Sequence, residues 1–404
     1  MTPSSQRATT TTSTARIWNR SFTSAFTAYF LINLGLNFGE VMVPPFAKAL
    51  GATPVVIGTV AGAFAGGAMV FKLVSAPAID AFRRKYVLLV AIVAIATAFA
   101  GFAFSTDVPT LTTFRILQGA GQAFTATTCI TLAADALPRE KLAAGIGVFA
   151  VASGAARMLG EPVALKIHEM TSFRFTFLVA VVMMVSSAVA SLSITTTPVP
   201  KKQFRPSLSG FIAVEAIPPA LLQLMFMLAW SCVNSFVVVF GQERGLGSNV
   251  GLFATVYGLG IFASAPLGGR LVDRFGFIMM LPMLGFFVAS LFLISIADDL
   301  CTLLVAAAVG AFGYGAAGPV ARTMAMSVVP PRRRGAASST LYLGSDLGQL
   351  AGPVIGGLLA ASLGYAVMFR AVSAFVGGAL VVLLLTRRFV TRARAAAAVA
   401  DDLT

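Results

Sequence analysis

The sequence predicts an all-α integral membrane protein with twelve transmembrane helices in two pseudo-symmetric six-helix bundles. Three observations support this fold class: the composition, the recurrence of long apolar runs, and charged landmarks that occur twice. Charged residues make up 11% of the 404 residues and the hydrophobic class 57%, with a mean hydropathy of +0.88. Because domains of soluble proteins carry roughly 25% charged residues, this composition excludes an ordinary soluble fold.

Apolar runs long enough to cross a bilayer follow one another from residue 21 to residue 386. A helix of about 20 apolar residues spans the hydrocarbon layer, whereas the strands of a membrane barrel alternate over about 10 residues. The expected spans are 21–44, 55–78, 86–106, 109–134, 143–165, 174–196, 211–240, 248–269, 277–297, 300–325, 338–361 and 366–386. The runs are continuous rather than alternating, so they indicate helices.

An aspartate followed by basic residues occurs twice, each time just after an apolar run. Asp80 precedes one basic cluster and Asp273 precedes the other, 193 residues further on (273 − 80 = 193). The basic loops that begin at Pro138 and Pro331 have the same offset (331 − 138 = 193). Two landmarks with one offset indicate two copies of a six-helix unit, which is how many secondary transporters are built.

These landmarks divide the chain into two bundles, a linker and two tails. The polar segment between the halves contains several prolines and lysines, which is typical of a linker. The first residues are rich in Ser and Thr and do not have the layout of a cleaved signal peptide. The expected division is a disordered cytoplasmic tail at 1–20, a bundle at 21–196, a cytoplasmic linker at 197–210, a bundle at 211–387 and a cytoplasmic tail at 388–404.

The net charge of +14 is concentrated on one side of the expected membrane. If the N-terminus is cytoplasmic, most of the 29 basic residues lie in cytoplasmic segments and only a few in outer loops. Basic residues that flank spans are retained in the cytoplasm, so we expect both termini there and the protein in the bacterial inner membrane. The basic charge then favours contact with anionic lipid, and we expect no nucleic-acid partner.

Three expected helices of the first half carry polar residues at helical spacing. An ionisable group at mid-bilayer costs about 2.5–3.5 kcal/mol on insertion scales, so such groups usually face a cavity or a partner. Residues three and four apart share one face of a helix. The residues are Asn33, Asn37 and Glu40 in span 21–44, Arg115, Gln118 and Gln122 in span 109–134, and Arg157 and Glu161 in span 143–165. Polar faces on three helices predict one shared aqueous cavity.

Glu40 and Arg115 are expected to lie at similar depths. The first helix runs outward and the fourth runs inward, so each residue falls near the outer third of its helix at 1.5 Å per residue. We expect them to form a coupled pair that serves as a proton-carrying site. The alternative is a permanent structural ion pair between the two helices.

Each of the other charged residues in the expected spans has two possible interpretations. Arg157 and Glu161, four residues apart, form either part of the cavity or a static pair that stiffens their helix. Asp346 is the clearest deep acid of the second half, and it either contacts substrate or protons or makes a packing hydrogen bond. Lys72 either extends its amine to the membrane interface or lines the cavity.

The second half is less charged and carries more aromatic residues in its expected spans. Trp230, Asn234, Tyr257 and Tyr314 are candidates for the opposite wall of the cavity. An aromatic wall facing a polar one suits amphipathic organic molecules. The alternative for each aromatic ring is ordinary packing or contact with lipid.

The repeated loops resemble those of the major facilitator superfamily, over about residues 22 to 387. The second loop, Gly269-Arg-Leu-Val-Asp273-Arg274-Phe-Gly276, is similar to the family's Gly-x-x-x-Asp-Arg-x-Gly motif. The resemblance implies a cytoplasmic gating latch whose candidates are Asp80, Arg84, Asp135, Gly269, Asp273 and Arg274. The segment Arg115-Ile-Leu-Gln118-Gly119 resembles the family's Arg-x-x-Gln-Gly motif, which implies a role of the arginine in proton coupling and substrate charge.

Two departures from the family pattern affect the details of this resemblance. The first loop has Ala76 where the motif begins with glycine. The glycine-proline signature of exporters occurs in span 338–361, around Gly352 and Pro353, whereas the family has it in the fifth helix. In the fifth span of this chain, Glu161 stands where that proline is expected. The resemblance is therefore closest to bacterial drug and metabolite efflux proteins, with the exporter signature displaced.

No motif in the sequence indicates catalysis or a cofactor. The string Gly313-Tyr-Gly-Ala-Ala-Gly318 lies inside an apolar span with no preceding strand, so it does not indicate dinucleotide binding. We instead expect glycines such as Gly348 and Gly352 to permit close helix packing. His168 is expected in an outer loop without a metal partner, and the three cysteines have no metal spacing. We expect no enzyme activity, no cofactor and no bound metal.

The combined prediction is a monomeric secondary transporter that works by alternating access. Its expected partners are a small-molecule substrate, protons and the lipid bilayer. The first hypothesis is proton-coupled efflux of small amphipathic organic compounds. The second is uptake or exchange of an organic anion, favoured by the arginines of the first half. A third, a non-transporting membrane sensor, needs a large output domain that the residues after Arg387 do not provide.

Overall fold

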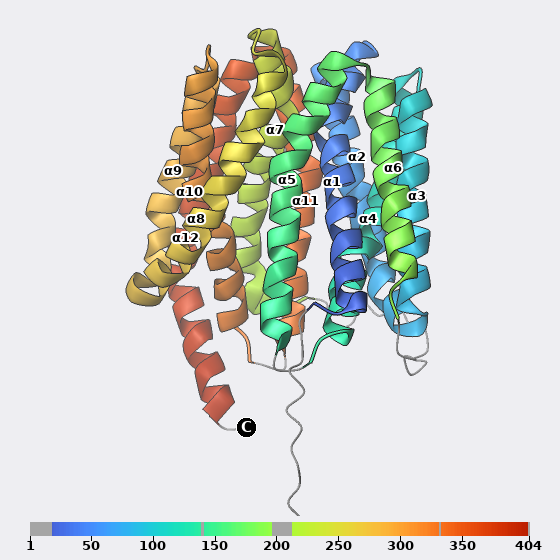
Figure 1. Ribbon diagram of the computed structural model, residues 1–404. Coiled ribbons are helices and arrows are strands. Elements are labelled where there is room, and N and C mark those ends of the chain that lie inside the picture. The colour runs from blue at the N-terminus through green and yellow to red at the C-terminus, as the bar shows by residue number, and fades with distance from the viewer. Residues whose placement is uncertain (1–17, 139–140, 196–211, 331–332, 403–404) are drawn as a thin grey trace, which may run out of the picture.

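The computed structural model describes residues 18–138, 141–195, 212–330 and 333–402, and these ranges contain helices and no strand. Figure 1 shows the helices running side by side through one bundle. They are α1 (Arg20–Ala49), α2 (Pro54–Ala81), α3 (Arg84–Phe104), α4 (Val108–Asp135), α5 (Leu142–Met170), α6 (Phe173–Leu192), α7 (Ile217–Glu243), α8 (Leu252–Phe275), α9 (Met280–Ser295), α10 (Leu300–Ser327), α11 (Arg334–Leu363) and α12 (Tyr365–Asp402), with short 3-10 turns η2 (Val214–Ala216), η3 (Gly247–Gly251) and η4 (Gly276–Met279). The predicted twelve-helix fold is confirmed.

Several helices extend beyond the apolar runs that predicted them. α5 continues to Met170, so His168 lies in its last turn with its ring centroid 3.8 Å from that of Phe173, and the expected loop position of His168 is wrong. α12 continues to Asp402, well past the expected end of its span at residue 386. Arginine and alanine are strong helix formers, so the charges near its end interrupt the apolar run without ending the helix. The expected linker and most of the expected N-terminal tail lie outside the described residues.

Ten of the helices in the described ranges are long and apolar enough to cross a membrane, and α4 and α8 are not among them. α4 contains the polar stripe with Arg115, Gln118 and Gln122, which lowers its apolar character. Its flanking helices enclose it, because α4 packs against α2 and α3 along its length. A polar helix at this place in a bundle has its polar groups covered by protein rather than by lipid.

The helices pack as two groups of six. α1 to α6 contact mainly one another, as do α7 to α12, and the groups meet through α2 with α11, α5 with α8, and α1 with α7. We call the end where α1 and α11 begin the terminal end, and the end where α1 and α7 finish the opposite end. In Figure 1 the terminal end is at the bottom and the opposite end is at the top.

Backbones of the two bundles touch near the opposite end. A Cβ atom on Gly58 of α2 would lie 2.0 Å from the carbonyl oxygen of Pro353 in α11, and one on Gly357 would lie 2.4 Å from that of Pro54. Such distances exclude any side chain, so only glycine permits this approach. At the rim, Lys48 Nζ lies 2.5 Å from Glu243 Oε1. The bundles are therefore closed against each other at this end.

Toward the terminal end the bundles are joined by α2 with α11 and by α5 with α8. Among the side chains that the structure describes, the ion pair nearest that end between bundles joins Lys72 of α2 to Asp346 of α11 at 2.6 Å. The contact between α5 and α8 extends toward the terminal end to Gly154 of α5, which lies against Phe262 of α8. Figure 1 shows α8 leaning away from α5 below this level. The two bundles thus meet at the opposite end and diverge at the terminal end.

Within the second bundle, α7 and α11 pack backbone to backbone. A Cβ atom on Gly352 would lie 2.5 Å from the carbonyl oxygen of Leu228. Ser231 Oγ donates to the carbonyl of Gly348 at 3.1 Å, and Cys232 Sγ to that of Gly352 at 2.9 Å. The close packing expected of these glycines is confirmed, and it fixes α7 against α11.

The two halves begin their fourth helices in the same way. Asp107 caps α4 by accepting from the backbone N–H of Thr110 at 2.8 Å, and Asp299 caps α10 by accepting from that of Thr302 at 2.9 Å. In both, the threonine hydroxyl also donates to the aspartate, at 3.0 and 2.8 Å. The caps are 192 residues apart (299 − 107 = 192), so they are a further copy of the repeat. These hydrogen bonds hold the pKa of both carboxyls below the usual aspartate value.

We expect Asp107→Ala and Asp299→Ala each to lower the apparent melting temperature of the detergent-solubilised protein by a few degrees, with nearly additive effects because the caps are far apart. A folded-state pKa below the unfolded one stabilises above the unfolded pKa and loses this contribution as pH falls through the folded pKa. The difference between wild type and each alanine variant should therefore shrink at acid pH. Asp107→Asn and Asp299→Asn, which keep the capping oxygen, are the controls. Alanine variants as stable as wild type at neutral pH would contradict the prediction.

Candidate functional site

A network of charged side chains lies where the two bundles meet. Glu40 comes from α1, Arg115 from α4, and Arg157 and Glu161 from α5. Arg115 Nη2 lies 3.5 Å from Glu40 Oε2, and Arg157 Nε lies 3.2 Å from Glu161 Oε1. The structure thus contains both ion pairs whose partners were identified by helix depth and by spacing. Their place between the bundles makes the network the candidate site.

Arg115 is held from several sides. Its side chain is only 2% exposed, and Nη1 donates to Gln118 Oε1 at 2.5 Å. The guanidinium also lies 4.7 Å from the ring centroid of Phe64 on α2, a cation–π contact. A buried charge is tolerated when it is paired and hydrogen-bonded. Arg115 is therefore fixed in the first bundle, and Glu40 is its ionic partner.

Asn234 of α7 connects this network to the second bundle. Its Nδ2 donates to Glu40 Oε1, and its Oδ1 accepts from Arg157 Nη2. An ionised carboxylate only accepts and a guanidinium only donates, so the two partners fix which way the amide points. The sequence analysis placed Asn234 on a cavity wall, but it did not identify these contacts.

The network is only partly covered by protein. Glu161 is 9% exposed, whereas Glu40 and Arg157 keep 31% and 29% of their side-chain surface. α1 is surrounded by α2, α4, α5 and α6 and touches α7 across the interface. The exposed part of Glu40 therefore faces the space between the bundles rather than the lipid.

Several buried polar atoms of the site have no hydrogen-bond partner among the described residues. They are Arg115 Nε, Gln118 Nε2, Glu161 Oε1 and Tyr257 Oη. Glu161 Oε1 lies near Arg157 Nε, but without the geometry of a hydrogen bond. Leaving a buried donor or acceptor unpaired costs about 1–3 kcal/mol. This set of donors and acceptors can therefore bind polar groups of a small molecule.

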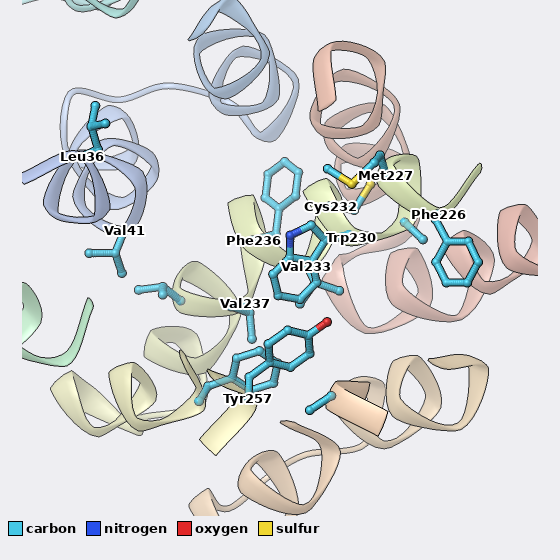
Figure 2. Packing of buried hydrophobic residues seen from close by; sticks show 14 of the residues in the cluster. Leu36, Val41, Phe226, Met227, Trp230, Cys232, Val233, Phe236, Val237 and Tyr257 are labelled. Carbon is cyan, nitrogen blue, oxygen red and sulfur yellow. The ribbon is translucent and has the colours of Figure 1, made fainter. Parts of the chain in front are cut away.

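An aromatic cluster borders the network on the side of the second bundle. The ring of Trp230 stacks on Tyr257 with centroids 4.4 Å apart and on Tyr314 with centroids 5.0 Å apart. Figure 2 shows Tyr257 lying below Trp230 on α7. Arg157 lies 5.2 Å from the centroid of a Trp230 ring. Tyr314 donates its hydroxyl to Met227 Sδ at 3.1 Å. The three rings thus form one surface that touches the charged network through Arg157.

Three predicted cavity residues satisfy their amides within their own helices. Asn33 Nδ2 donates to the carbonyl of Tyr29, and Asn37 Nδ2 to that of Asn33, both at 2.7 Å. Gln122 Oε1 accepts from Thr125 Oγ1 at 2.8 Å. No hydrogen bond from these amides to the charged network is found among the described residues.

Asp346 does not join the network, because it pairs with Lys72 across the interface between α2 and α11. The sequence analysis treated the two residues separately and missed the pair. A signal existed, since both are isolated charges well inside long apolar spans. Matching their depths from the ends of their helices would have suggested the contact.

The predicted latch is described only in part. Arg84 at the start of α3 forms an ion pair with Asp135 at the end of α4. Arg274 lies 5.2 Å from the ring centroid of its neighbour Phe275. The side chains of Asp80 and Asp273, and the surroundings of Gly269, lie outside the described part of the chain. In the described residues, no group of three or more His, Cys, Asp or Glu forms a metal site.

Comparison with known families gives one match that extends over both halves. The model of the Major Facilitator Superfamily matches residues 25–218 and again residues 219–400. The chain is 27% identical over 245 residues to a chloramphenicol resistance protein of Streptomyces lividans, covering 58% of this chain and 62% of that protein. It is 22% identical over 373 residues to the multi-drug resistance efflux pump PmrA of Streptococcus pneumoniae, covering 88% of this chain and 93% of the pump.

Solved structures with the same fold cover nearly the whole chain. A bacterial homologue of the human lysosomal transporter Spinster superposes with a TM-score of 0.75 at 16% identity, covering 93% of this chain and 98% of that chain. The nucleoside transporter NupG superposes with a TM-score of 0.75 at 12% identity, covering 92% of this chain and 99% of that chain. Likeness at this identity establishes the fold and not the substrate.

Arg115→Met should lower the apparent melting temperature in detergent, because it leaves Glu40 and Gln118 without their buried cation. Breaking a fully buried pair costs about 3–5 kcal/mol, and partial exposure of Glu40 places this pair at about 2–3 kcal/mol. Arg115→Met combined with Glu40→Gln should recover part of the loss. A double-mutant cycle on the melting temperatures measures this coupling. Strictly additive effects would show that the two side chains do not interact.

Proposed function

The chain belongs to the major facilitator superfamily, and we propose that it exports small amphipathic organic compounds by alternating access, driven by protons. Members of this family are membrane transporters rather than enzymes. The observation that best supports this proposal is a network of charged side chains between two bundles that are closed against each other at one end. The network consists of Glu40, Arg115, Arg157 and Glu161. A site at the interface of two repeats is where such transporters bind substrate and coupling ion.

The proposed orientation puts the terminal end in the cytoplasm. Basic residues flank the spans at that end, including Arg20, Arg84 and Arg334 at helix starts, and such residues are retained inside. With this orientation, the closed opposite end faces outward and the diverging end faces the cytoplasm. The geometry then corresponds to a carrier open to the cytoplasm, from which an exporter loads its substrate.

Glu40 and Glu161 are the proposed proton carriers. Each has a guanidinium within ion-pair distance, and Glu40 keeps enough exposed surface to exchange a proton with water between the bundles. A carboxylate next to an arginine changes its proton affinity when that arginine moves or finds another partner. Substrate that engages the arginine or the carboxylate therefore alters the proton occupancy of the same site.

The aromatic surface supports an amphipathic substrate. Trp230 and Tyr257 are 7% and 1% exposed and stack with the half-buried Tyr314, so the rings form an apolar wall whose free face opens when the bundles move, and the charged network beside them supplies donors and acceptors. Pockets for organic ligands combine mostly apolar walls with a few placed polar groups. Export is further supported by the relatives named as a chloramphenicol resistance protein and a multi-drug efflux pump. We propose that the transporter works as a monomer in the bacterial cell membrane.

An organic anion is the second candidate substrate class. Arg115 and Arg157 both reach the interface, and Arg115 Nε is buried without a hydrogen-bond partner in the described chain. A planar guanidinium binds carboxylates in two-pronged geometry. Exchange of an aromatic carboxylate for another anion therefore also fits the site.

Glu40→Gln should abolish transport driven by a proton gradient, because it removes the titrating group while keeping the shape of the side chain. In proteoliposomes loaded with a panel of chloramphenicol, ethidium and benzoate, we expect at least a tenfold loss of gradient-driven flux of the transported probe. Exchange of the probe at equal pH should persist. Glu243→Gln, which neutralises an exposed carboxylate at the rim, is the matched control. Gradient-driven flux at the wild-type rate in Glu40→Gln would rule out the proposed proton carrier.

The same panel distinguishes the two substrate classes. If the protein carries amphipathic cations or neutral compounds, Arg157→Gln should leave their equilibrium exchange within a few-fold of wild type. If it carries anions, the same variant should lose benzoate transport, because a carboxylate then has no partner at that position. Benzoate flux in the wild type that disappears in Arg157→Gln would favour the anion exchanger over the exporter.

A further inference from the structure

Asn234 is the one side chain of the second bundle that hydrogen-bonds to the charged network among the described residues. It donates to Glu40 and accepts from Arg157, both on the first bundle. Hydrogen bonds to charged groups are roughly twice as strong as those between neutral groups. This amide therefore forms a strong polar link between the bundles at the interface of α1 and α7.

The position of this link relates it to closure of the opposite end. Glu40 precedes Lys48 by 8 residues on α1, and Asn234 precedes Glu243 by 9 residues on α7, about 12 Å and about 13.5 Å along the two helices. The rim pair of Lys48 and Glu243 is 42% and 43% exposed, and exposed pairs contribute little. No polar contact between α1 and α7 nearer the terminal end is found among the described residues. The hydrogen bond of Asn234 to Glu40 is thus the polar contact between α1 and α7 that lies farthest from the opposite end in the described residues.

We propose that Asn234 locks the empty, deprotonated transporter closed at its opposite end, and that neutralising Glu40 releases the lock. The inference rests on the proposed proton-carrying role of Glu40. The ionised carboxylate accepts from the Asn234 amide and from Arg115. When Glu40 takes up a proton, the hydrogen bond from Asn234 loses its ionic partner and the link between the bundles weakens.

The other charges around Glu40 all belong to the first bundle. The ionisable groups that face it are Arg115 from α4 and Arg157 and Glu161 from α5. With Glu40 and Glu161 both ionised, the two guanidinia and the two carboxylates balance. With Glu40 neutral, two cations and one anion remain, and the two guanidinia lie in the same bundle, so their repulsion acts within the first bundle. The weaker contact between the Asn234 amide and Glu40 is what favours separation of α1 from α7.

Such a lock explains how one site serves exchange of substrate for protons. An exporter must not switch its site from one side of the membrane to the other when the site holds neither substrate nor proton. Such an empty return step would let protons flow without export and so dissipate the proton gradient. A proton on Glu40 releases the lock, and so does a substrate whose polar group displaces the Asn234 amide. Either ligand alone therefore permits the transition, and the empty carrier remains closed.

The test measures the width of the opposite end without any substrate. Spin labels on Thr53→Cys, immediately before α2, and Asn249→Cys of η3, both exposed, report the separation of the bundles by double electron–electron resonance. The exposed Cys301 is replaced by serine, while Cys129 and Cys232 are buried. In the wild type we expect the short distance at alkaline pH and a growing long-distance population at acid pH.

Asn234→Leu, which has the same shape but no hydrogen-bonding atoms, should populate the long distance at every pH. We expect the open-to-closed ratio at alkaline pH to rise roughly tenfold, equivalent to about 1.4 kcal/mol. Glu40→Gln should give the same pH-independent result through the other partner, and it carries the test if Asn234→Leu does not fold. Asn234→Gln, which keeps donor and acceptor, should restore part of the pH response. Glu243→Gln at the rim should keep the wild-type profile.

An Asn234→Leu protein with the wild-type distances and pH profile would overturn the inference. This failure is distinct from failure of the proposed function. If Glu40→Gln responds as expected but Asn234→Leu behaves like wild type, Glu40 carries protons without the lock. If Glu40→Gln keeps gradient-driven flux in proteoliposomes, the proposed function fails in an assay that does not involve Asn234.

Discussion

The structure depends on one constraint, which is that a charge inside a membrane protein needs a partner where water is scarce. The fold meets this constraint by grouping its buried charges where the two bundles face each other. Glu40 and Arg115 pair between α1 and α4, Arg157 and Glu161 pair within α5, and Asn234 connects the two pairs from the other bundle. Removing any one of the four charged groups leaves another charge without its ion-pair partner. Both ion pairs lie in the first bundle, so only the contacts of Asn234 require the two bundles to stay close.

The same constraint makes the site responsive to ligands. A paired charge gains little from a new partner, but within the described ranges the network includes buried donors and acceptors without a hydrogen bond, beside the ring stack of Trp230, Tyr257 and Tyr314. A molecule that is flat and apolar on one side and polar on the other can contact both. In the proposed mechanism, binding rearranges the ionic partners, and the rearrangement reaches both bundles because Asn234 belongs to the second one.

Much of the fold was predictable from the sequence, because the features that decide it are local stretches of the chain. Apolar length decides whether a segment crosses the bilayer, and the repeated charged loops decide where one copy ends and the next begins. Depth along each helix predicted that Glu40 and Arg115 lie at one level, and spacing predicted the pair of Arg157 with Glu161. The contacts of Asn234, and of Lys72 with Asp346, depend on how two bundles dock, which no local pattern records. The span expected at 366–386 matches the apolar part of α12, Tyr365–Thr386, and the helix itself continues to Asp402, because hydropathy marks the edge of the bilayer and not the end of a helix.

α11 contacts two helices through nearly bare backbone. Gly352 lies against α7 of its own bundle, while Gly357 and the carbonyl of Pro353 lie against Pro54 and Gly58 of α2 in the other. Where side chains interdigitate, one helix cannot shift on another without changing many rotamers at once. A glycine contact has no such interlocking, so α2 and α11 can part without a change of rotamers. The closed end can therefore open without repacking of this part of the interface.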